Sequence, residues 1–477
     1  MDQPRLLGSS AVMKRVRLEQ LLAAIDGTAV GFSNQDIEFE SIATDSRTIQ
    51  SEQLFWALQG DNHDGHDFVR DANRRGAIAS VVAAGNSGKA KGPRIEVEDT
   101  LVALLDFTHW YRREFEALVV GITGSVGKTT TRRMIHSILS TKFNGIQSPK
   151  NFNNQFGVPF SVLQLDSHHE FAVLELAASR IGEIRELADV VAPEVGIVTS
   201  VSTAHLAGFG TLERVAAAKG ELIEALPESG FAVLNGDDAN CRQLAKLAKC
   251  PTFFVGEGAE NDLQATDVTI EVDSVSFTAD GQRFCVSATG RHHLTAALAG
   301  IVVGREVGLD AEEIHEGLCR YEPAPGRCQR KVVGDITLID DTYNSSPRSV
   351  QAACDLLEDW PVATRRILVL GDMLELGRAA SDLHFNTGQY IGEAGLDGLI
   401  AVGQFADDLV GGAIDSGMTS KRIATCRDHA VLTVVLDCWL QSGDVVLVKG
   451  SRSTHMESVV HWIEGRIPVS SGLRRAA

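Results

Sequence analysis

The stretch GITGSVGKTTTRRMI, residues 121–135, decides the fold of the middle of the chain. The short apolar run from Leu118 to Ile122 predicts a β-strand, the glycines after it predict a tight turn, and the residues from Lys128 onward predict a helix. Glycines let backbone N–H groups approach a phosphate, and the N-terminus of the following helix favours negative charge. This order of strand, glycine turn and helix predicts a phosphate-binding loop.

The loop itself reads Thr123-Gly124-Ser125-Val126-Gly127-Lys128-Thr129. Lys128 supplies a point charge for phosphate, and a threonine hydroxyl after it is a candidate ligand for Mg²⁺. The regular motif G-x-x-x-x-G-K-[ST] places its first glycine at position 122, where this chain has Ile122, and the nearest glycine is Gly121. The motif is therefore met only in part, and an ordinary glycine turn with a surface lysine is the alternative.

Outward from the loop, apolar runs alternate with helix-like segments. The runs LVVGIT, FAVLELA, VGIVTSV and FAVLNG predict a parallel sheet that is covered by helices on both faces. The proline- and glycine-containing string EPAPGRCQ, residues 322–329, predicts a linker, after which ITLIDD, RRILVLGDM, GLIAVG and VVLVKGS begin another α/β series. The first part of the chain is of mixed character. We therefore expect three α/β domains: a small one at 1–117, a phosphate-loop domain at 118–324 and a Rossmann-like domain at 325–477.

Composition excludes several classes of function. The 477 residues include 44 Lys and Arg against 63 Asp and Glu, a net charge of −19 that disfavours nucleic acid as a partner. No run of apolar residues is long enough to cross a membrane, and the N-terminus lacks the apolar core of a secretory signal. The eight cysteines show no zinc-finger spacing, which fits reduced thiols. We expect a cytoplasmic, monomeric protein that acts on small molecules.

Two side chains follow successive predicted strands at the edge where ligands bind in such sheets. Glu175 ends the run FAVLELA, and His205 follows the run VGIVTSV. A lone strand-end Glu is more often a helix cap and a lone His more often structural, but the pair together favours metal binding. The sequence around Lys219, VAAAKGEL, by itself predicts an exposed lysine on a helix.

Several strings occur in the order seen in Mur ligases, the ATP-dependent amide ligases that build the peptide of the bacterial wall precursor. They are TGSVGKTT, NFNNQFGVP (151–159), AHLAGFGTLERVAAAKGEL (204–222), GRHHLTAALAG (290–300), PGRCQ (325–329) and IDDTYNSSP (339–347). Within that family, TDSR (44–47), LQGDNHDGHDF (58–68), LGDMLELG (370–377) and VKGSRS (448–453) resemble the branch that adds the dipeptide D-alanyl-D-alanine. The resemblance spans roughly residues 41 to 460.

The resemblance implies a UDP-sugar-peptide domain, an ATP domain and a C-terminal domain that closes on both. It also implies that the γ-phosphoryl group of ATP is transferred to the peptide carboxylate, and that the amine of the dipeptide attacks the resulting acyl phosphate. Two Mg²⁺ ions are implied, the first held by Thr129 and Glu175, the second near Glu175, His205 and a carbamate on Lys219. Lys128, Arg327 and the asparagines Asn153 and Asn154, of which Asn154 is favoured, complete the implied catalytic set.

The remaining site residues are also carried over from the resemblance. Nucleotide contacts are implied for Gly124, Ser125, Gly127, Lys128, Thr129, Thr130, His293, Arg327, Asp341 and Tyr343. Substrate contacts are implied for Ser46, Arg47, Asp64, Gly65, His66, Lys449 and Ser451. Two alternatives stay open: the DGH turn could equally be a plain Asp-Gly loop, and the less favoured alternative for Arg327 is a linker residue in an ion pair.

One departure concerns the adenine site. Mur ligases usually read G-R-H-N-x-x-N where this chain has His293 and Ala296, so altered nucleotide affinity is expected. The ligase that adds the third amino acid usually carries D-N-P-R, which is absent from this sequence. A simple phosphate-loop ATPase needs neither Glu175 nor Lys219, and a nucleotide-binding regulator is suggested only by the changed adenine positions.

Overall fold

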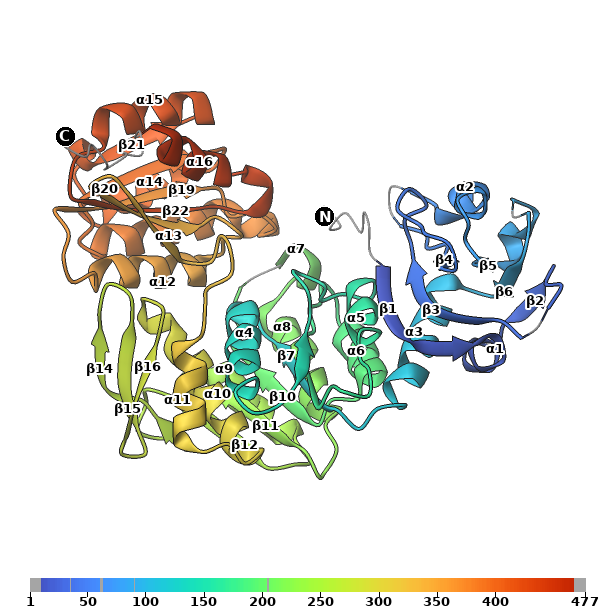
Figure 1. Ribbon diagram of the computed structural model, residues 1–477. Helices are drawn as coiled ribbons and strands as arrows, with labels where there is room; N and C mark the ends of the chain where they lie inside the picture. The colour runs from blue at the N-terminus through green and yellow to red at the C-terminus, as the bar shows by residue number, and fades with distance from the viewer. Residues whose placement is uncertain (1–9, 35, 61–62, 90, 204–205, 467–477) are drawn as a thin grey trace, which may run out of the picture.

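A computed structural model describes residues 10–34, 36–60, 63–89, 91–203 and 206–466. Figure 1 shows three α/β units that follow one another along the chain, the first in blue, the second in green and yellow, the third in orange and red. In these described ranges, no helix has both the length and the apolar character needed to span a bilayer. The predicted three-domain α/β architecture is confirmed, whereas the boundaries after residues 117 and 324 stay predictions.

The N-terminal unit is built on a six-stranded mixed sheet. Its elements are β1 (Ser10–Arg17), α1 (Leu18–Ile25), β2 (Thr28–Val30), β3 (Glu38–Ala43), β4 (Leu54–Trp56), η1 (Gly65–Phe68), α2 (Val69–Arg74), β5 (Ala79–Ala83), η2 (Ala84–Lys89), β6 (Arg94–Val97) and α3 (Thr100–Arg112). The strand order is β1-β3-β4-β5-β6-β2. The inner pairs are parallel and the two outer pairs antiparallel, so both edges differ from a purely parallel α/β sheet.

The central unit contains a seven-stranded sheet in which every pairing is parallel. Its elements are β7 (Leu118–Thr123), α4 (Lys128–Leu139), β8 (Gly145–Gln147), α5 (Gly157–Val162), β9 (Phe171–Glu175), α6 (Glu183–Val191), β10 (Val195–Val198), α7 (Leu206–Phe209), α8 (Leu212–Glu224), β11 (Phe231–Asn235), α9 (Ala239–Leu244), η3 (Ala245–Leu247), β12 (Thr252–Gly256), β13 (Leu263–Gln264), η4 (Arg291–His293), α10 (Leu294–Glu306) and α11 (Ala311–Cys319). The order β13-β12-β11-β10-β7-β9-β8 confirms the predicted parallel sheet.

That strand order determines where the candidate site lies. β7 sits between β9 and β10, with Ile122 opposite Glu175 and Thr123 opposite Val198. All residues of β9 and β10 are buried, because helices cover both faces of the sheet. The carboxyl ends of the three strands therefore meet directly below the phosphate loop.

A second, antiparallel sheet of three strands branches from the central unit. It comprises β14 (Thr266–Ile270), β15 (Val275–Ala279) and β16 (Gln282–Val286), in that order. Along β15, buried residues alternate with half-buried ones, which is the two-residue period of a one-sided sheet. The sequence analysis did not predict this sheet, although the Asp280-Gly281 pair between β15 and β16 is a hairpin signal.

The C-terminal unit carries a six-stranded sheet of order β17-β18-β22-β19-β20-β21. Its elements are β17 (Gln329–Val333), β18 (Ile336–Asp341), α12 (Pro347–Glu358), β19 (Arg365–Gly371), η5 (Gly377–Ala379), α13 (Ala380–Glu393), β20 (Gly398–Val402), α14 (Ala406–Asp415), η6 (Ser420–Arg422), β21 (Ile423–Cys426), α15 (His429–Trp439), β22 (Asp444–Lys449), η7 (Arg452–Thr454) and α16 (Glu457–Arg466). Only the β17–β18 pair is antiparallel. Asp341 and Lys449 end neighbouring strands in register.

Helix α3 joins the first two units. The Tyr111 hydroxyl donates to the carbonyl of Leu165 and accepts the N–H of Lys14, both at 2.7 Å. Arg112 pairs with Glu194 at 3.0 Å. One hydrophobic core runs from the N-terminal sheet through α3 into the central unit, so these two units pack as a continuous body at this face.

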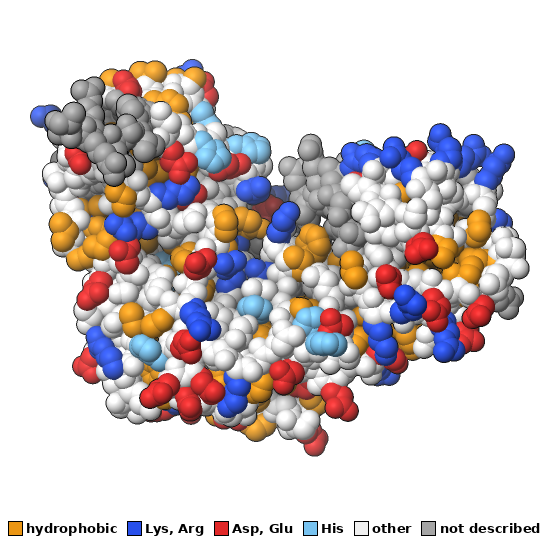
Figure 2. All heavy atoms as spheres, viewed as in Figure 1, with side chains coloured by type: hydrophobic (Ala, Val, Ile, Leu, Met, Phe, Trp, Pro, Cys, Tyr) orange, Lys and Arg blue, Asp and Glu red, His pale blue; other side chains and the backbone are white. Residues whose placement is uncertain are grey.

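The C-terminal unit touches the central one close to the candidate site. The N–H of Ala207 on α7 donates to the carbonyl of Glu375 at 3.1 Å. Figure 2 shows a notch in the surface above the central unit, between the N-terminal and C-terminal units, and Lys and Arg side chains gathered over the face of the N-terminal unit around α2. A protein of net charge −19 thus presents basic surface in one region of this view.

Candidate active site

The phosphate loop is folded against the end of β10. Gly124 and Gly127 have φ of 147° and 88°, which favour glycine. A Cβ on Gly124 would lie 2.0 Å from the Thr199 hydroxyl oxygen, so this position also has no room for a side chain. The Ser125 N–H donates to the Ser200 carbonyl at 2.9 Å. The loop is therefore already shaped before any phosphate arrives.

Lys128 is the first residue of α4, and its ammonium lies over the loop. Its Nζ donates to the Gly124 carbonyl at 2.6 Å. Burial lowers the pKa of Lys128 to about 8, an effect that Glu175 opposes and Arg327 reinforces. Among the described residues, its ammonium donates only to this neutral carbonyl, so it is poised to bind an anion at the mouth of the sheet.

Glu175 is a buried carboxylate with one oxygen open. It is 1% exposed at the end of β9, and its Oε2 accepts a hydrogen bond from Asn153 at 3.4 Å. Its Oε1 accepts no hydrogen bond from the residues that the structure describes, although Nη1 of Arg132 lies 3.2 Å away. Arg132 was not among the predicted site residues, although a cation one helical turn after Lys128 is expected on the same helix face.

Lys219 is buried on α8, in contrast to the exposed lysine that its sequence context alone suggests. It is 3% exposed, and its ammonium lies 5.6 Å from the centre of the Phe209 ring. Burial, followed by the positive charge of Lys128, lowers the pKa of Lys219 to about 7. A substantial fraction of its amine is therefore uncharged at neutral pH, and the uncharged form is the one that reacts with carbon dioxide.

Some of the predicted metal ligands are suited to a hard divalent ion. His205 lies outside the described residues, and within the described residues no cluster of three or more His, Cys, Asp and Glu side chains has metal-binding geometry. The open, buried Oε1 of Glu175 and the hydroxyl of Thr129, which ends the loop, are oxygen donors of the kind that Mg²⁺ prefers. Lys219 would contribute a further oxygen donor only as a carbamate.

The two asparagines of the 151–159 string do different things. Asn153 contacts Glu175, as described above. Asn154 forms a turn just before α5, in which its Oδ1 accepts the N–H groups of Phe156 at 3.2 Å and Gly157 at 2.9 Å. The structure thus brings Asn153, rather than the favoured Asn154, to the carboxylate of Glu175.

Arg327 reaches the phosphate loop from the segment that precedes the C-terminal sheet. Its Nη2 donates to the Thr129 hydroxyl at 3.4 Å, and its guanidinium lies 4.0 Å above the Tyr343 ring. Thr130, the next residue, contacts the buried hydroxyl of Tyr321. The prediction that Arg327 reaches across to the loop is thus matched by the geometry, and its phosphate contact stays a prediction.

Three other predicted C-terminal residues are engaged inside the protein. The Lys449 ammonium is 2% exposed and donates to the Asp341 carboxylate at 2.6 Å. The other oxygen of Asp341 accepts the Cys328 N–H at 3.2 Å. Ser451 accepts the Leu374 N–H at 2.8 Å. These side chains fix the carboxyl ends of β18 and β22, and any ligand contact must be made around those bonds.

His293 and Ala296, which replace the usual asparagines, are both buried. The His293 ring lies 5.7 Å from the Tyr321 ring, and its Nδ1 is 3.2 Å from the Gly290 carbonyl. Burial, with the neighbouring His292, holds the pKa of His293 well below its usual value, so the ring is neutral. The structure therefore presents an uncharged aromatic ring at this position.

The predicted N-terminal residues bond to one another. The Asp45 carboxylate binds the Arg47 guanidinium through both oxygens, at 2.9 and 2.8 Å, beside the buried Ser46. The buried His66 ring donates from Nδ1 to Asp64 at 2.6 Å and accepts the Ala83 N–H at Nε2. Each motif thus has a role within the fold.

Gly65 lies between those two residues and is confined by the backbone. A Cβ there would sit 2.7 Å from both the N and O atoms of Leu58. The structure therefore explains the DGH string by close backbone packing, and its substrate contacts stay predictions.

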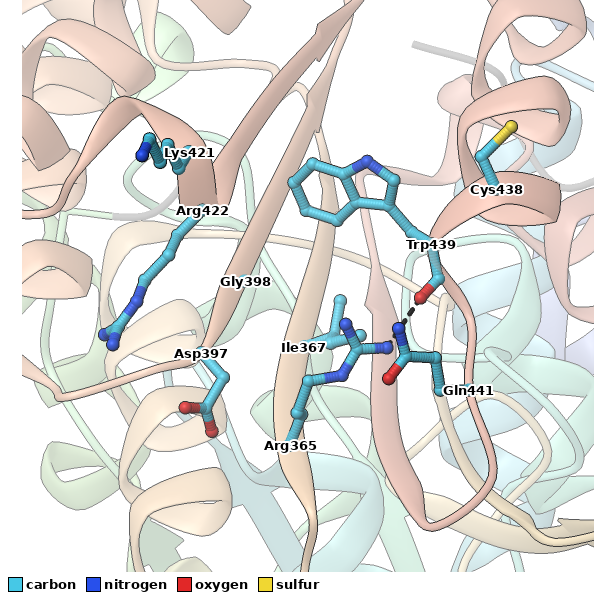
Figure 3. Close-up of a pocket in the computed structure, with 9 residues that line it drawn as sticks. All are labelled: Arg365, Ile367, Asp397, Gly398, Lys421, Arg422, Cys438, Trp439 and Gln441. Atoms are coloured by element: carbon cyan, nitrogen blue, oxygen red, sulfur yellow. Dashed lines mark hydrogen bonds between the residues drawn. The ribbon is translucent and has the colours of Figure 1, made fainter.

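A separate hollow of about 240 Å³ lies far from this chemistry, where β19 and β20 begin. Figure 3 shows Arg365, which donates to the backbone carbonyl of Trp439 at 2.6 Å, on one side of the hollow and Lys421, Arg422 and Asp397 on the other. Asp341 and Lys449 end their strands at the opposite edge of the same sheet. The hollow is thus not part of the candidate active site.

Comparison with known proteins gives the class of the molecule: the chain belongs to the Mur ligase family. Residues 38–111 match the model described as Mur ligase family, catalytic domain; residues 122–304 match the Mur ligase middle domain; residues 326–452 match the Mur ligase, glutamate ligase domain. A relative from Synechocystis sp., named UDP-N-acetylmuramoyl-tripeptide--D-alanyl-D-alanine ligase, is 36% identical over 92% of this chain and 94% of its own length. The resemblance seen in the sequence is confirmed.

Solved structures agree over the whole chain. The crystal structure of MurF from Acinetobacter baumannii matches with a TM-score of 0.88 and 28% identity, covering 96% of this chain and 100% of that one. MurF from Thermotoga maritima in complex with ADP matches with a TM-score of 0.78 and 29% identity, covering 89% and 97%. Both relationships extend through all three units.

Proposed function

We propose that the protein is an ATP-dependent ligase that joins D-alanyl-D-alanine to UDP-N-acetylmuramoyl-tripeptide in peptidoglycan precursor synthesis. The products are UDP-N-acetylmuramoyl-pentapeptide, ADP and phosphate. The observation that carries the proposal is the meeting of Lys128, Glu175 and Lys219 at one sheet edge, with Arg327 arriving from the segment before the C-terminal sheet. The full-length similarity to ligases of this name supports the choice of substrates.

The reaction first makes the tripeptide carboxylate reactive. Its oxygen attacks the γ-phosphorus of ATP, ADP leaves, and an acyl phosphate forms. The amine of the dipeptide then attacks the acyl carbon, phosphate leaves with the original carboxylate oxygen, and the amine loses a proton. The loop N–H groups, Lys128 and Arg327 stabilise the negative charge that gathers on the transferring phosphoryl group.

Two Mg²⁺ ions belong to this proposal, and when bound they would neutralise the phosphates and the incoming carboxylate. Thr129, Glu175 and a carbamate on Lys219 would hold them, together with His205. The buried, open oxygen of Glu175 and the lowered pKa of Lys219 support these assignments. A carbamate converts a buried cation into an anion, which removes the repulsion between Lys219 and Lys128.

The other predicted contacts complete the proposal. The N-terminal motifs and the basic face around α2 would hold the UDP-sugar end, and Asp341, Tyr343 and His293 would line the nucleotide side. Lys449 and Ser451 would shape the dipeptide side. We also propose a cytoplasmic monomer divided at residues 117 and 324.

The test measures phosphate release from ATP with each substrate omitted in turn, alongside mass spectrometry of the products. Release that requires both UDP-N-acetylmuramoyl-tripeptide and D-alanyl-D-alanine, with the pentapeptide formed in equal amount, is the expected result. Steady release without either substrate would instead identify a simple ATPase. Tripeptides ending in diaminopimelate and in lysine should be compared, because the sequence does not distinguish them.

A further inference from the structure

Arg132 is a buried cation that faces the candidate metal site. It lies on α4, is 3% exposed, and is one helical turn beyond Lys128. Its Nη1 lies 3.2 Å from Oε1 of Glu175, itself 1% exposed. Side chains four residues apart share a helix face, so α4 points two cations toward the end of β9.

The guanidinium of Arg132 is fixed by the backbone of another segment. Its Nη1 donates to the carbonyl of Lys150 at 2.9 Å and also to the carbonyl of Ser148. The same segment continues to Asn153, whose amide contacts the other oxygen of Glu175. Arg132 therefore ties α4, the 148–153 segment and β9 together and cannot turn away without breaking these bonds.

Arg132 and Glu175 form an ion pair without a hydrogen bond between them. Within the described parts of the chain, Oε1 of Glu175 accepts no hydrogen bond and Nε of Arg132 donates none. A buried carboxylate without a nearby cation is strongly unfavourable. The guanidinium thus supplies the compensating charge and leaves the lone pairs of Oε1 available to a second cation.

We infer that Arg132 is a positioning residue that acts as the built-in counter-ion of Glu175 when no divalent ion is bound, while leaving Oε1 free to receive that ion. The inference rests on the proposed function, because it takes Glu175 as a metal ligand. It assigns to one side chain the task of compensating the charge of a buried carboxylate and holding the segments around it in place.

Thermal unfolding of the full-length protein tests this assignment without reference to activity. The variants are Arg132→Met, which removes the charge, and Arg132→Lys, which keeps it. In metal-free buffer, Arg132→Met should unfold about 5 °C or more below the wild type, and Arg132→Lys should lie between them. Saturating MgCl₂, compared with NaCl of equal ionic strength, should raise the midpoint of Arg132→Met more than that of the other two proteins, because the ion replaces the missing charge.

The double variant Arg132→Met/Glu175→Gln keeps the test decisive if Arg132→Met does not fold. Removing both charges should raise the metal-free midpoint above that of Arg132→Met, although not to that of the wild type, because the bonds of Arg132 to Ser148 and Lys150 are also lost. It should abolish the specific Mg²⁺ response, since a neutral pair needs no counter-ion. Two results would overturn the inference. The first is an equal rise of the unfolding midpoint with Mg²⁺ in the wild type, Arg132→Met and Arg132→Lys. The second is a double variant as unstable as Arg132→Met. Failure of the wild type to make pentapeptide would overturn the proposed function and leave these midpoints unaffected, so the two failures are distinguishable.

Discussion

The phosphate-loop site and the N-terminal motifs contain similar residue types but use them in opposite ways. Around the loop, charged groups are buried with few hydrogen bonds: Oε1 of Glu175 accepts none from the described residues, and the pKa values of Lys128 and Lys219 are lowered by burial. In the N-terminal motifs, Arg47 is paired with Asp45 and both ring nitrogens of His66 are bonded.

This difference separates residues that await ligands from residues that shape the backbone. Burying a charge without a hydrogen-bond partner is unfavourable in free energy. Such groups are typical of functional sites, where a bound ligand of opposite charge compensates for them. A satisfied cluster contributes to the fold whether or not a ligand is bound. Substitutions near the loop should therefore change turnover, and those in the N-terminal motifs should change stability or KM.

The largest effect is expected for Lys128→Ala. Loss of the charge beside the transferring phosphoryl group should lower kcat by about 10³ or more, equivalent to about 4 kcal/mol at 1.36 kcal/mol per factor of ten. Steady-state phosphate release with both substrates measures this. The unfolding midpoint should not fall, because a buried cation is removed; a variant with normal turnover would contradict the contrast between the two regions.

The next effect is expected for Lys219→Ala, with a fall in kcat of about 10²–10³ if its carbamate holds metal. The wild type should also lose activity as the pH falls below about 7, because the pKa of Lys219 is lowered to about 7 and only the uncharged amine forms a carbamate. Added bicarbonate should raise the activity of wild type depleted of carbon dioxide. It should leave Lys219→Ala unchanged, and near-normal turnover of that variant would reject the carbamate.

A smaller effect, of a different kind, is expected for Gly65→Ala. The added Cβ would press on the Leu58 backbone at 2.7 Å, which should destabilise the protein by about 1–3 kcal/mol and raise KM for the UDP-substrate. Denaturant unfolding measures the first quantity. Gly85→Ala is the matched control, because a Cβ there meets no atom within 4 Å. Equal stability of the two variants would remove the packing explanation of the DGH string.

The smallest effect on stability is expected for Arg47→Ala, because its side chain is 61% exposed. The unfolding midpoint and kcat should stay the same, whereas KM for the UDP-tripeptide should rise several-fold if Arg47 contacts that substrate. Arg320→Ala serves as the control, because Arg320 is also 61% exposed and pairs with a carboxylate, Glu316, but lies in the central unit. If Arg47→Ala keeps the wild-type KM, as the control should, Arg47 does not contact the substrate.

Much of the fold could be predicted because its signals are local. The fully apolar runs of β7, β9 and β10 and the glycines before Lys128 specify a parallel sheet with a phosphate loop at its edge. The three-stranded sheet escaped prediction because its strands, TDVTI, VSFTA and QRFCV, mix polar with apolar residues and form no continuous apolar run. The packing of helix α3 between the N-terminal and central units was not predicted, because an amphipathic segment does not show which two units it contacts.

The sequence by itself determined the phosphate loop, the parallel central sheet, the acid at the end of β9 and the membership of the family, because each depends on the order of residues along the chain. Only the tertiary structure decided that Arg132 faces Glu175, that Lys219 is buried and that Lys449 is held by Asp341. These are contacts between segments tens of residues apart or more, and burial and charge pairing arise only when packing removes water from between them.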